Sequence, residues 1–363
     1  MSCSPCPSGM TAPLPMNVFK KCPKCTMKLE RPFLGGTAIL MAQLLLAFST
    51  AHGHSLNNQS VSARIERVAA GSVGRLGVAA QEIQGQEVVA INGHESFVMA
   101  SSYKVAIATA VLDRVDKGEL RLDQLVTVTP DRIIAADSVI AEQFVHPGIQ
   151  LSLANLIEAM ITESDNTATD LCMELAGGPA AVTKKLRSIG ITDQRVDRPV
   201  AEGLRDFYGL PAPGTASVAA EFFKNNPAQL AVAAQLKPNP AFEKDPRDQT
   251  TPLAMLQLLL AIDSSKALSP ESREFLLGSM SRTRTGAGRL KGLLPKGTPV
   301  AHKTGTIGGV ANDVGYITLP DGRRFAVAVY TNSSETPVLD RDRAIAEVAR
   351  MLYDYFYLRP VAK

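Results

Sequence analysis

Three short segments of this chain carry side chains suited to acyl transfer through a serine. They are Ser101-Ser102-Tyr103-Lys104, Ser164-Asp165-Asn166 and Lys303-Thr304-Gly305. Together they supply hydroxyl, ammonium and amide groups. A serine hydroxyl becomes an effective nucleophile when a neighbouring base takes its proton, and charged donors bind anionic substrates strongly. The three segments therefore favour covalent catalysis through serine.

The first segment begins a helix that is predicted from Ser101 to about Lys117 and ends at Gly118. A spacing of three residues places Ser101 and Lys104 on the same helix face. The helix N-terminus also offers a free backbone N–H and a favourable dipole for a developing oxyanion. Because a Ser-x-x-Lys pattern is expected about once by chance in a chain of this length, a capped helix with a solvated lysine is the alternative.

The other two segments are predicted on a loop and on a strand. Residues 164–166 lie between two amphipathic helices, where they could deliver two polar side chains into a cleft or simply cap a helix. Lys303 and Gly305 lie in a strand, where both residue types are disfavoured. A strand glycine suits the close approach of another backbone, and Lys303 with Thr304 suits a carboxylate; an edge strand protected by lysine is the alternative.

Hydrophobic periodicity predicts the elements that must position these segments. Helices are predicted at 62–70, 101–117, 153–161, 167–176, 251–262 and 340–357, with a further one starting at Pro179. Strands are predicted at 76–80, 87–91, 300–306, 314–319 and 324–331. Residues 205–246, rich in Pro, Ala and Asn, are predicted as a long irregular excursion.

This order predicts an α+β fold of the α/β/α sandwich type. The two chain ends, about 60–100 and 265–360, would form one five-stranded antiparallel sheet covered by helices. Residues of about 105–260 would form an all-helical lobe. We expect the ligand site between the sheet lobe and the helical lobe.

Residues 1–53 read as a secretory signal segment that precedes a catalytic domain of residues 54–363. Five basic residues precede an apolar run at 33–48, and small residues follow at 49, 51 and 53. The run is short for a spanning helix, so an uncleaved membrane anchor is the alternative. We expect a periplasmic or secreted protein after cleavage.

Charge and cysteine content change at the same boundary. Beyond residue 53 the chain has 33 Lys and Arg against 34 Asp and Glu, so its net charge is −1 and no nucleic-acid partner is expected. Cys3, Cys6, Cys22 and Cys25 precede the boundary, and their spacing matches a zinc ribbon. The interpretation that we prefer is that translation starts further along the chain, at Met16 or Met27. Cys172 is predicted in the core. Five histidines without ligand spacing predict no metal or cofactor.

From about Ser62 to Phe356 the chain resembles the class A serine β-lactamases. The resemblance rests on the three segments above and on five further matches: Asn166-Thr167-Ala168, Gly177-Gly178-Pro179, Val196-Asp197-Arg198, Thr250-Thr251-Pro252-Leu253-Ala254-Met255 and Gly292-Leu293-Leu294-Pro295. It implies the lobed fold predicted above and a monomeric, exported hydrolase that acts on β-lactam antibiotics.

The resemblance also implies a role for each matching residue. Ser101 would be the acylated nucleophile, Lys104 its base or part of the proton relay, and Ser164 the proton donor to the leaving nitrogen. The backbone N–H groups of Ser101 and Thr306 would form the oxyanion hole.

Substrate binding is implied at the remaining positions. Asn166 would bind the amide of the substrate side chain, and Lys303, Thr304 and Gly305 would hold its carboxylate end. Arg289 falls where some relatives place an arginine that assists carboxylate binding; a solvated surface arginine is the alternative.

The chain departs from the family where the acyl-enzyme is hydrolysed. The position of the family's water-activating glutamate holds Val200, and only a small shift would bring Glu202 into that role. Arg198 is expected to pair with Asp248 across an intervening segment of about fifty residues, unusually long for such a loop. Two other functions therefore remain open: a DD-peptidase acting on peptidoglycan stem peptides, and a sensor that is acylated without turnover.

Overall fold

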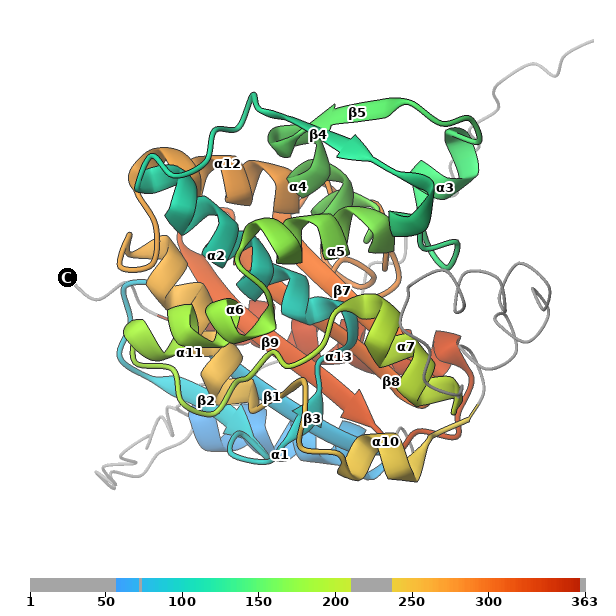
Figure 1. Cartoon of the computed structure of the whole chain (residues 1–363). Coiled ribbons are helices and arrows are strands. Elements are labelled where there is room, and N and C mark those ends of the chain that lie inside the picture. Colours follow the sequence, from blue (N-terminus) through green and yellow to red (C-terminus); the bar gives the residue numbers. More distant parts are fainter. Residues whose placement is uncertain (1–56, 72–73, 210–236, 360–363) are drawn as a thin grey trace, which may run out of the picture. The chain divides into compact units, whose positions relative to one another are not determined.

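The computed structural model describes residues 57–71, 74–209 and 237–359, all of which fall within the predicted catalytic domain of residues 54–363 (Figure 1). The predicted signal segment and its four cysteines lie outside the described residues. Within the described ranges, no helix has the length and apolar character needed to cross a bilayer.

A five-stranded antiparallel sheet lies at the centre of the molecule, and its strand order is β2-β1-β9-β8-β7. The strands are β1 (Arg75–Glu82), β2 (Val88–Ile91), β7 (Val300–Ile307), β8 (Val310–Thr318) and β9 (Arg324–Asn332). The prediction of one sheet built from both chain ends is confirmed. Strand β8 begins four residues earlier than predicted, because the polar but buried Asn312 and Asp313 interrupt its apolar pattern.

Helices cover both faces of this sheet (Figure 1). On one face, α1 (Asn58–Ala70) and α13 (Val338–Tyr357) pack on alternate strand residues such as Val327 and Val329. The opposite strand residues, such as Ala328, share a second core cluster with α11 (Pro252–Asp263).

The helical lobe completes this second core. Its helices are α2 (Lys104–Asp116), α3 (Val139–Gln143), α4 (Leu153–Thr162), α5 (Asn166–Leu175), α6 (Pro179–Ser188), α7 (Val200–Tyr208) and α12 (Pro270–Ser281). Cys172 is buried there, as predicted.

The lobe differs from the prediction in three respects. It includes α12, which lies within residues 265–360 and was predicted to belong to the sheet lobe. It is not all-helical, because β4 (Leu125–Val128) pairs with β5 (Ile149–Ser152), two short runs of alternating burial. The predicted excursion at 205–246 is also partly regular. Helix α7 continues to Tyr208, α10 spans Pro240–Lys244, and residues 210–236 lie outside the described ranges.

Candidate active site

Ser101 lies in a 3₁₀ turn, η1 (Ala100–Tyr103), that leads directly into α2. In a 3₁₀ helix the side chains at i and i+3 eclipse one another, so Ser101 and Lys104 keep the shared face predicted for them. The preceding Ala100 has a φ of +43°, a left-handed conformation that sharply redirects the chain before Ser101. The small β3 (Phe97–Val98), paired with β6 (Gln249–Thr250), leads into this turn.

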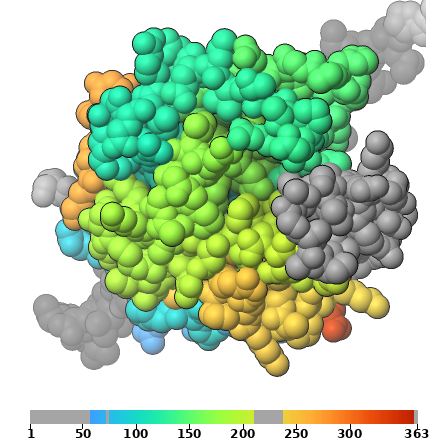
Figure 2. Space-filling view, in the orientation of Figure 1, coloured from blue at the N-terminus to red at the C-terminus, as the bar shows by residue number. Residues whose placement is uncertain are grey.

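A pocket of about 90 Å³ opens beside this turn. Ser101, Asn166 and Thr306 contribute its polar lining, while Val200 and Phe242 belong to its apolar part. The lining therefore comes from η1, α5, α7, α10 and β7. Figure 2 shows the face on which the helical lobe, in green, meets α10 and the residues after it, in yellow.

Two buried lysines converge on one hydroxyl at the centre of the site. The Nζ of Lys104 lies 3.2 Å from Ser164 Oγ, and the Nζ of Lys303 lies 2.9 Å from the same oxygen. Lys104 also donates to the Ser164 carbonyl at 2.6 Å and to Asn166 Oδ1 at 2.8 Å. The structure thus brings together side chains from all three predicted segments.

The electrostatics of this group follow from burial. Both lysines are fully buried, and their described hydrogen bonds go to neutral oxygens. Removal from water disfavours the charged form of an amine. Burial therefore lowers the pKa of Lys104 to about 8, although the nearby Asp165 carboxylate partly opposes it. Burial and the neighbouring Lys104 hold the pKa of Lys303 well below its usual range.

Asp165 fixes the loop that carries Ser164 and Asn166. Its carboxylate caps α5 through the Ala168 N–H at 2.7 Å and accepts from the Ile140 N–H at 2.9 Å. Ser164 has a φ of +61°, which turns the chain sharply before α5. Both interpretations of this segment hold, because Asp165 caps α5 while the side chains of Ser164 and Asn166 contact Lys104. Of these two side chains, Asn166 also lines the pocket.

Gly305 explains why β7 can lie against the nucleophile turn. A Cβ on this glycine would lie 2.6 Å from the Met99 carbonyl oxygen and 3.1 Å from the Ser101 nitrogen. Any other residue would push the strand away from Ser101, so the predicted close approach of another backbone is confirmed.

Arg289 lies behind β7 and is 4% exposed, so the alternative of a solvated surface arginine is wrong. Its guanidinium donates to Asp342 at 2.7 Å, to the Gly305 carbonyl at 3.0 Å and to Thr306 Oγ1 at 2.7 Å. Since arginine only donates, the Thr306 hydroxyl accepts this bond and keeps its own proton free to donate elsewhere. No sequence pattern pointed to Thr285, whose hydroxyl lies 2.6 Å from that of Thr304.

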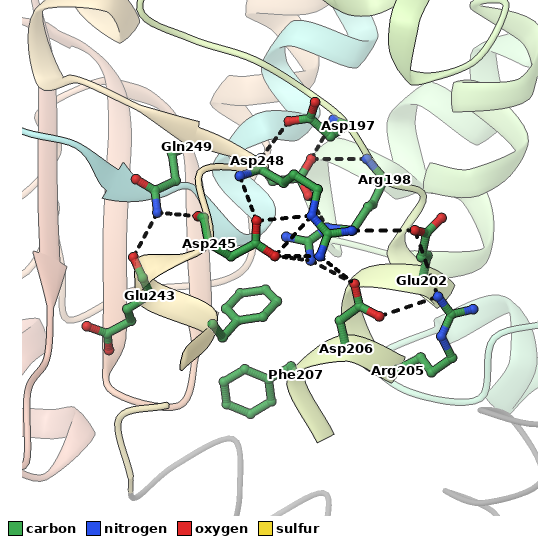
Figure 3. Close-up of polar contacts among 12 residues, drawn as sticks. Asp197, Arg198, Glu202, Arg205, Asp206, Phe207, Glu243, Asp245, Asp248 and Gln249 are labelled. Carbon is green, nitrogen blue, oxygen red and sulfur yellow. Dashed lines mark hydrogen bonds and ion pairs between the residues drawn. The ribbon is translucent and has the colours of Figure 1, made fainter. Parts of the chain in front are cut away.

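The predicted Arg198–Asp248 pair forms, with 2.6 Å between Nε and Oδ2, and it belongs to a larger ionic network (Figure 3). The same guanidinium, 1% exposed, also contacts Asp206 on α7 and Asp245 after α10. Phe242 lies under it at 4.9 Å. This network joins α7 to α10.

Glu202 does not line the pocket that contains Ser101. Its carboxylate belongs to a separate groove, where it lies 3.8 Å from both Arg205 and Arg247 and is 39% exposed (Figure 3). Helix α7 instead presents Val200 and Leu204 to the pocket. Because a helical turn spans 3.6 residues, Val200 and Leu204 share one face of α7, and Glu202 lies on the opposite face and points outward. The geometry therefore offers no support for a role of Glu202 in activating water.

Asp170 is a further residue that sequence reasoning missed. It lies on α5, four residues after Asn166, and accepts from the backbone N–H groups of Val200 at 2.6 Å and Ala201 at 3.1 Å. Burial raises the pKa of this carboxyl to about 6. An acidic residue on the inner face of a predicted helix was the available signal.

Comparisons with known proteins agree with this geometry. A sequence profile described as the beta-lactamase enzyme family matches residues 60–356. The chain is 30% identical to Beta-lactamase VEB-1 and 31% identical to Extended-spectrum beta-lactamase PER-1, both from Pseudomonas aeruginosa. These alignments cover 88% of this chain and 97% and 94% of the relatives.

Solved structures show the same relationship. The chain is 30% identical to a beta-lactamase from Chitinophaga pinensis, with a TM-score of 0.67 over 82% of this chain and 99% of that one. For an ancestral class A beta-lactamase the identity is 36% and the TM-score 0.66, over 80% of this chain and 98% of that one. The chain therefore belongs to the β-lactamase enzyme family, and it is a serine hydrolase of the class A type.

Proposed function

We propose that the protein opens the β-lactam amide by forming an acyl ester on Ser101 and then hydrolyses that ester. The observation that carries this proposal is the convergence of Lys104 and Lys303 on Ser164 beside the pocket that Ser101 lines. The candidate base Lys104 and the hydroxyl relay Ser164 are hydrogen-bonded to each other, and the nucleophile Ser101 lies one helical turn before Lys104 at the edge of the pocket.

Acylation begins with loss of the Ser101 proton. A lysine with a pKa of about 8 has a neutral fraction of roughly one tenth at pH 7, which can accept this proton. Ser101 Oγ attacks the lactam carbonyl, and the backbone N–H groups of Ser101 and Thr306 stabilise the oxyanion. The carbon–nitrogen bond then breaks, Ser164 protonates the nitrogen, and Lys104 replaces the proton that Ser164 gave up.

The substrate carboxylate is positioned by the groups along β7. The Lys303 ammonium supplies the charge, and the hydroxyls of Thr304 and Thr306 supply hydrogen bonds. An anion beside Lys303 also offsets the repulsion between two ammonium groups that share one oxygen.

The decisive experiment mixes the purified protein with a chromogenic cephalosporin and follows colour and intact mass together. Continuous colour with a transient adduct on Ser101 is expected, and Ser101→Ala should give neither. Colour that continues in Ser101→Ala would contradict the proposal.

A second function, acylation with little or no turnover, is favoured by one observation. Among the described residues that line the pocket, the carboxylates are those of Asp137 and Asp248, and Asp248 already accepts bonds from Arg198 and the Asp197 N–H. One equivalent of colour with a lasting adduct would support this penicillin-binding or sensor function. Because Glu202 faces away from the pocket, Glu202→Gln should leave the release rate unchanged.

We also propose that residues 1–53 direct export and are removed, and that the exported enzyme confers β-lactam resistance. The basic residues, apolar run and small residues of the segment support this. N-terminal sequencing of the periplasmic protein should give a start close to residue 54, and expression should raise the inhibitory concentration of a penicillin. An intact N-terminus would contradict the cleavage.

A further inference from the structure

We propose that the buried His302–Asp313 pair behind β7 is the counter-charge that keeps the Lys303 side chain an ammonium, and that Asp313 is thereby a positioning residue for the substrate carboxylate. The inference rests on the function proposed above. It concerns two fully buried side chains that take no part in the acylation steps.

The pair lies one residue away from Lys303 on the paired strands. His302 Nδ1 lies 2.8 Å and 2.9 Å from the two carboxylate oxygens of Asp313. In the register of β7 and β8, Asp313 is directly opposite Thr304. Asp313 therefore lies on the neighbouring strand, next to the residues that are to hold the substrate carboxylate.

The hydrogen bonds indicate the charge of the pair. His302 Nε2 is buried and has no partner among the described residues. A protonated imidazole would leave an N–H donor of a charged ring buried and unsatisfied, which is costly. The Nδ1 that faces two carboxylate oxygens carries the proton of the neutral ring. The pair therefore keeps the single negative charge of Asp313.

Lys303 lies near two other cationic side chains, so a nearby negative charge is needed to keep it protonated. Lys104 shares Ser164 Oγ with it, and Arg289 lies behind the same strand. Burial lowers the pKa of Lys303, and Lys104 and Arg289 lower it further, whereas the Asp313 carboxylate raises it. Arg289 is already bound to Asp342 at 2.7 Å, so that carboxylate is engaged elsewhere.

The same pair ties the loop behind β7 to the strand. Asp313 Oδ2 accepts from the Leu290 N–H at 3.2 Å, and the Thr283 hydroxyl donates to the His302 carbonyl at 2.6 Å. Between these anchors lie Thr285 and Arg289, which contact the Thr304 and Thr306 hydroxyls. A purely structural role for the pair would act through this loop and would not depend on pH.

The test measures the pH dependence of KM and kcat between pH 6 and 9.5 for the native protein and for Asp313→Asn. Without the carboxylate the Lys303 ammonium loses its proton at lower pH. The ratio of variant to native KM should therefore rise between pH 6 and pH 9.5, towards a limit of about tenfold for a pKa change of about one unit. His302→Gln, which retains the carboxylate, should show a much smaller pH-dependent change.

Asp263→Asn is the matched control, because Asp263 is 8% exposed and pairs with Arg324 of the same sheet at 2.6 Å. It should leave the pH profile of KM unchanged. A KM ratio for Asp313→Asn that is the same at every pH would overturn the inference, as would a native-like profile. If the native protein never forms an acyl-enzyme, the proposed function fails instead.

A direct measurement covers the case in which Asp313→Asn does not fold. The ¹³Cε resonance of Lys303, assigned with Lys303→Arg in lysine-labelled native protein, reports the charge of that side chain without any substrate. We expect an ammonium at pH 7. A neutral amine at pH 7 in the folded native protein would contradict the inference.

Discussion

At the scale of single residues, the chemistry depends on how two buried ammonium groups are arranged around one hydroxyl. Ser164 Oγ can accept from Lys104 and Lys303 and donate its own proton to a leaving group. Only a side chain that can lose a proton near neutral pH can serve as the base for Ser101. Lys104, with its pKa lowered to about 8, meets this condition.

Lys104→Arg should therefore keep a charge in the site but remove the base, because arginine does not deprotonate in proteins. We expect the acylation rate to fall about 100-fold or more. In the native protein the acylation rate should rise with pH up to about pH 8, as Lys104 loses its proton, and this rise should be absent in the variant. Stopped-flow acylation from pH 6 to 9.5 checks this. Lys117→Arg, at an exposed position at the end of the same helix, is the control and should acylate at the native rate. Acylation at the native rate in Lys104→Arg would exclude Lys104 as the base.

At the scale of elements, the wall of the pocket depends on charges that hold α7 and α10 in place. Arg198 connects the two helices through Asp206 and Asp245 and is itself bound by Asp248. Asp170 holds the start of α7 through two backbone N–H groups. Each attachment is partly or fully buried, so each is expected to contribute more than an exposed ion pair.

Asp248→Asn should destabilise the fold by about 3 kcal/mol, because it leaves part of a buried guanidinium charge uncompensated. Asparagine tolerates the positive φ of 54° at this position, so backbone strain does not add to the effect. Urea unfolding measures the difference. Asp123→Asn, which breaks an exposed pair with Arg121, should have a much smaller effect on the free energy of unfolding. Equal effects of the two substitutions would show that burial of the network is unimportant.

Asp170 predicts a specific dependence of stability on pH. Its folded-state pKa, about 6, lies above the ordinary value of 3.8, so the folded protein binds the proton more tightly than the unfolded chain. The contribution of this group to stability is therefore fully present below about pH 4 and is lost as the pH rises through about 6. Relative to Asp170→Asn, the native free energy of unfolding should fall by on the order of 2–3 kcal/mol across this range. A constant difference would contradict the shift.

At the scale of the whole molecule, the sheet lobe and the helical lobe are not independent. Ala328 and Tyr330 of β9 belong to the same buried cluster as Leu156 of α4 and Met255 of α11. The Tyr316 hydroxyl on β8 also donates to the Leu259 carbonyl at 2.7 Å. Since neither lobe can expose this cluster without disrupting the other, we expect the two lobes to unfold together.

Tryptophan fluorescence can test this cooperativity, because the chain has no tryptophan of its own. Phe144→Trp would report on the helical lobe and Tyr357→Trp on the sheet lobe, both at partly exposed positions. The urea midpoints measured by fluorescence and by circular dichroism should coincide in each variant. A separate transition at one probe would show that the lobes unfold independently.

The sequence alone predicted the five strands of the sheet, its construction from both chain ends and the three segments that meet at the site. Hydrophobic periodicity specifies the buried faces of helices and strands. Gly305 allows a close backbone approach and Asp165 caps a helix, and both effects depend on the local residue type. Tertiary structure decided the rest. Glu202 faces outward because of the helical turn of α7. Arg289 can be buried because Asp342, which lies far along the sequence on α13, compensates its charge. The lowered pKa of Lys104 depends on burial by residues far along the chain, which no local pattern of residues records.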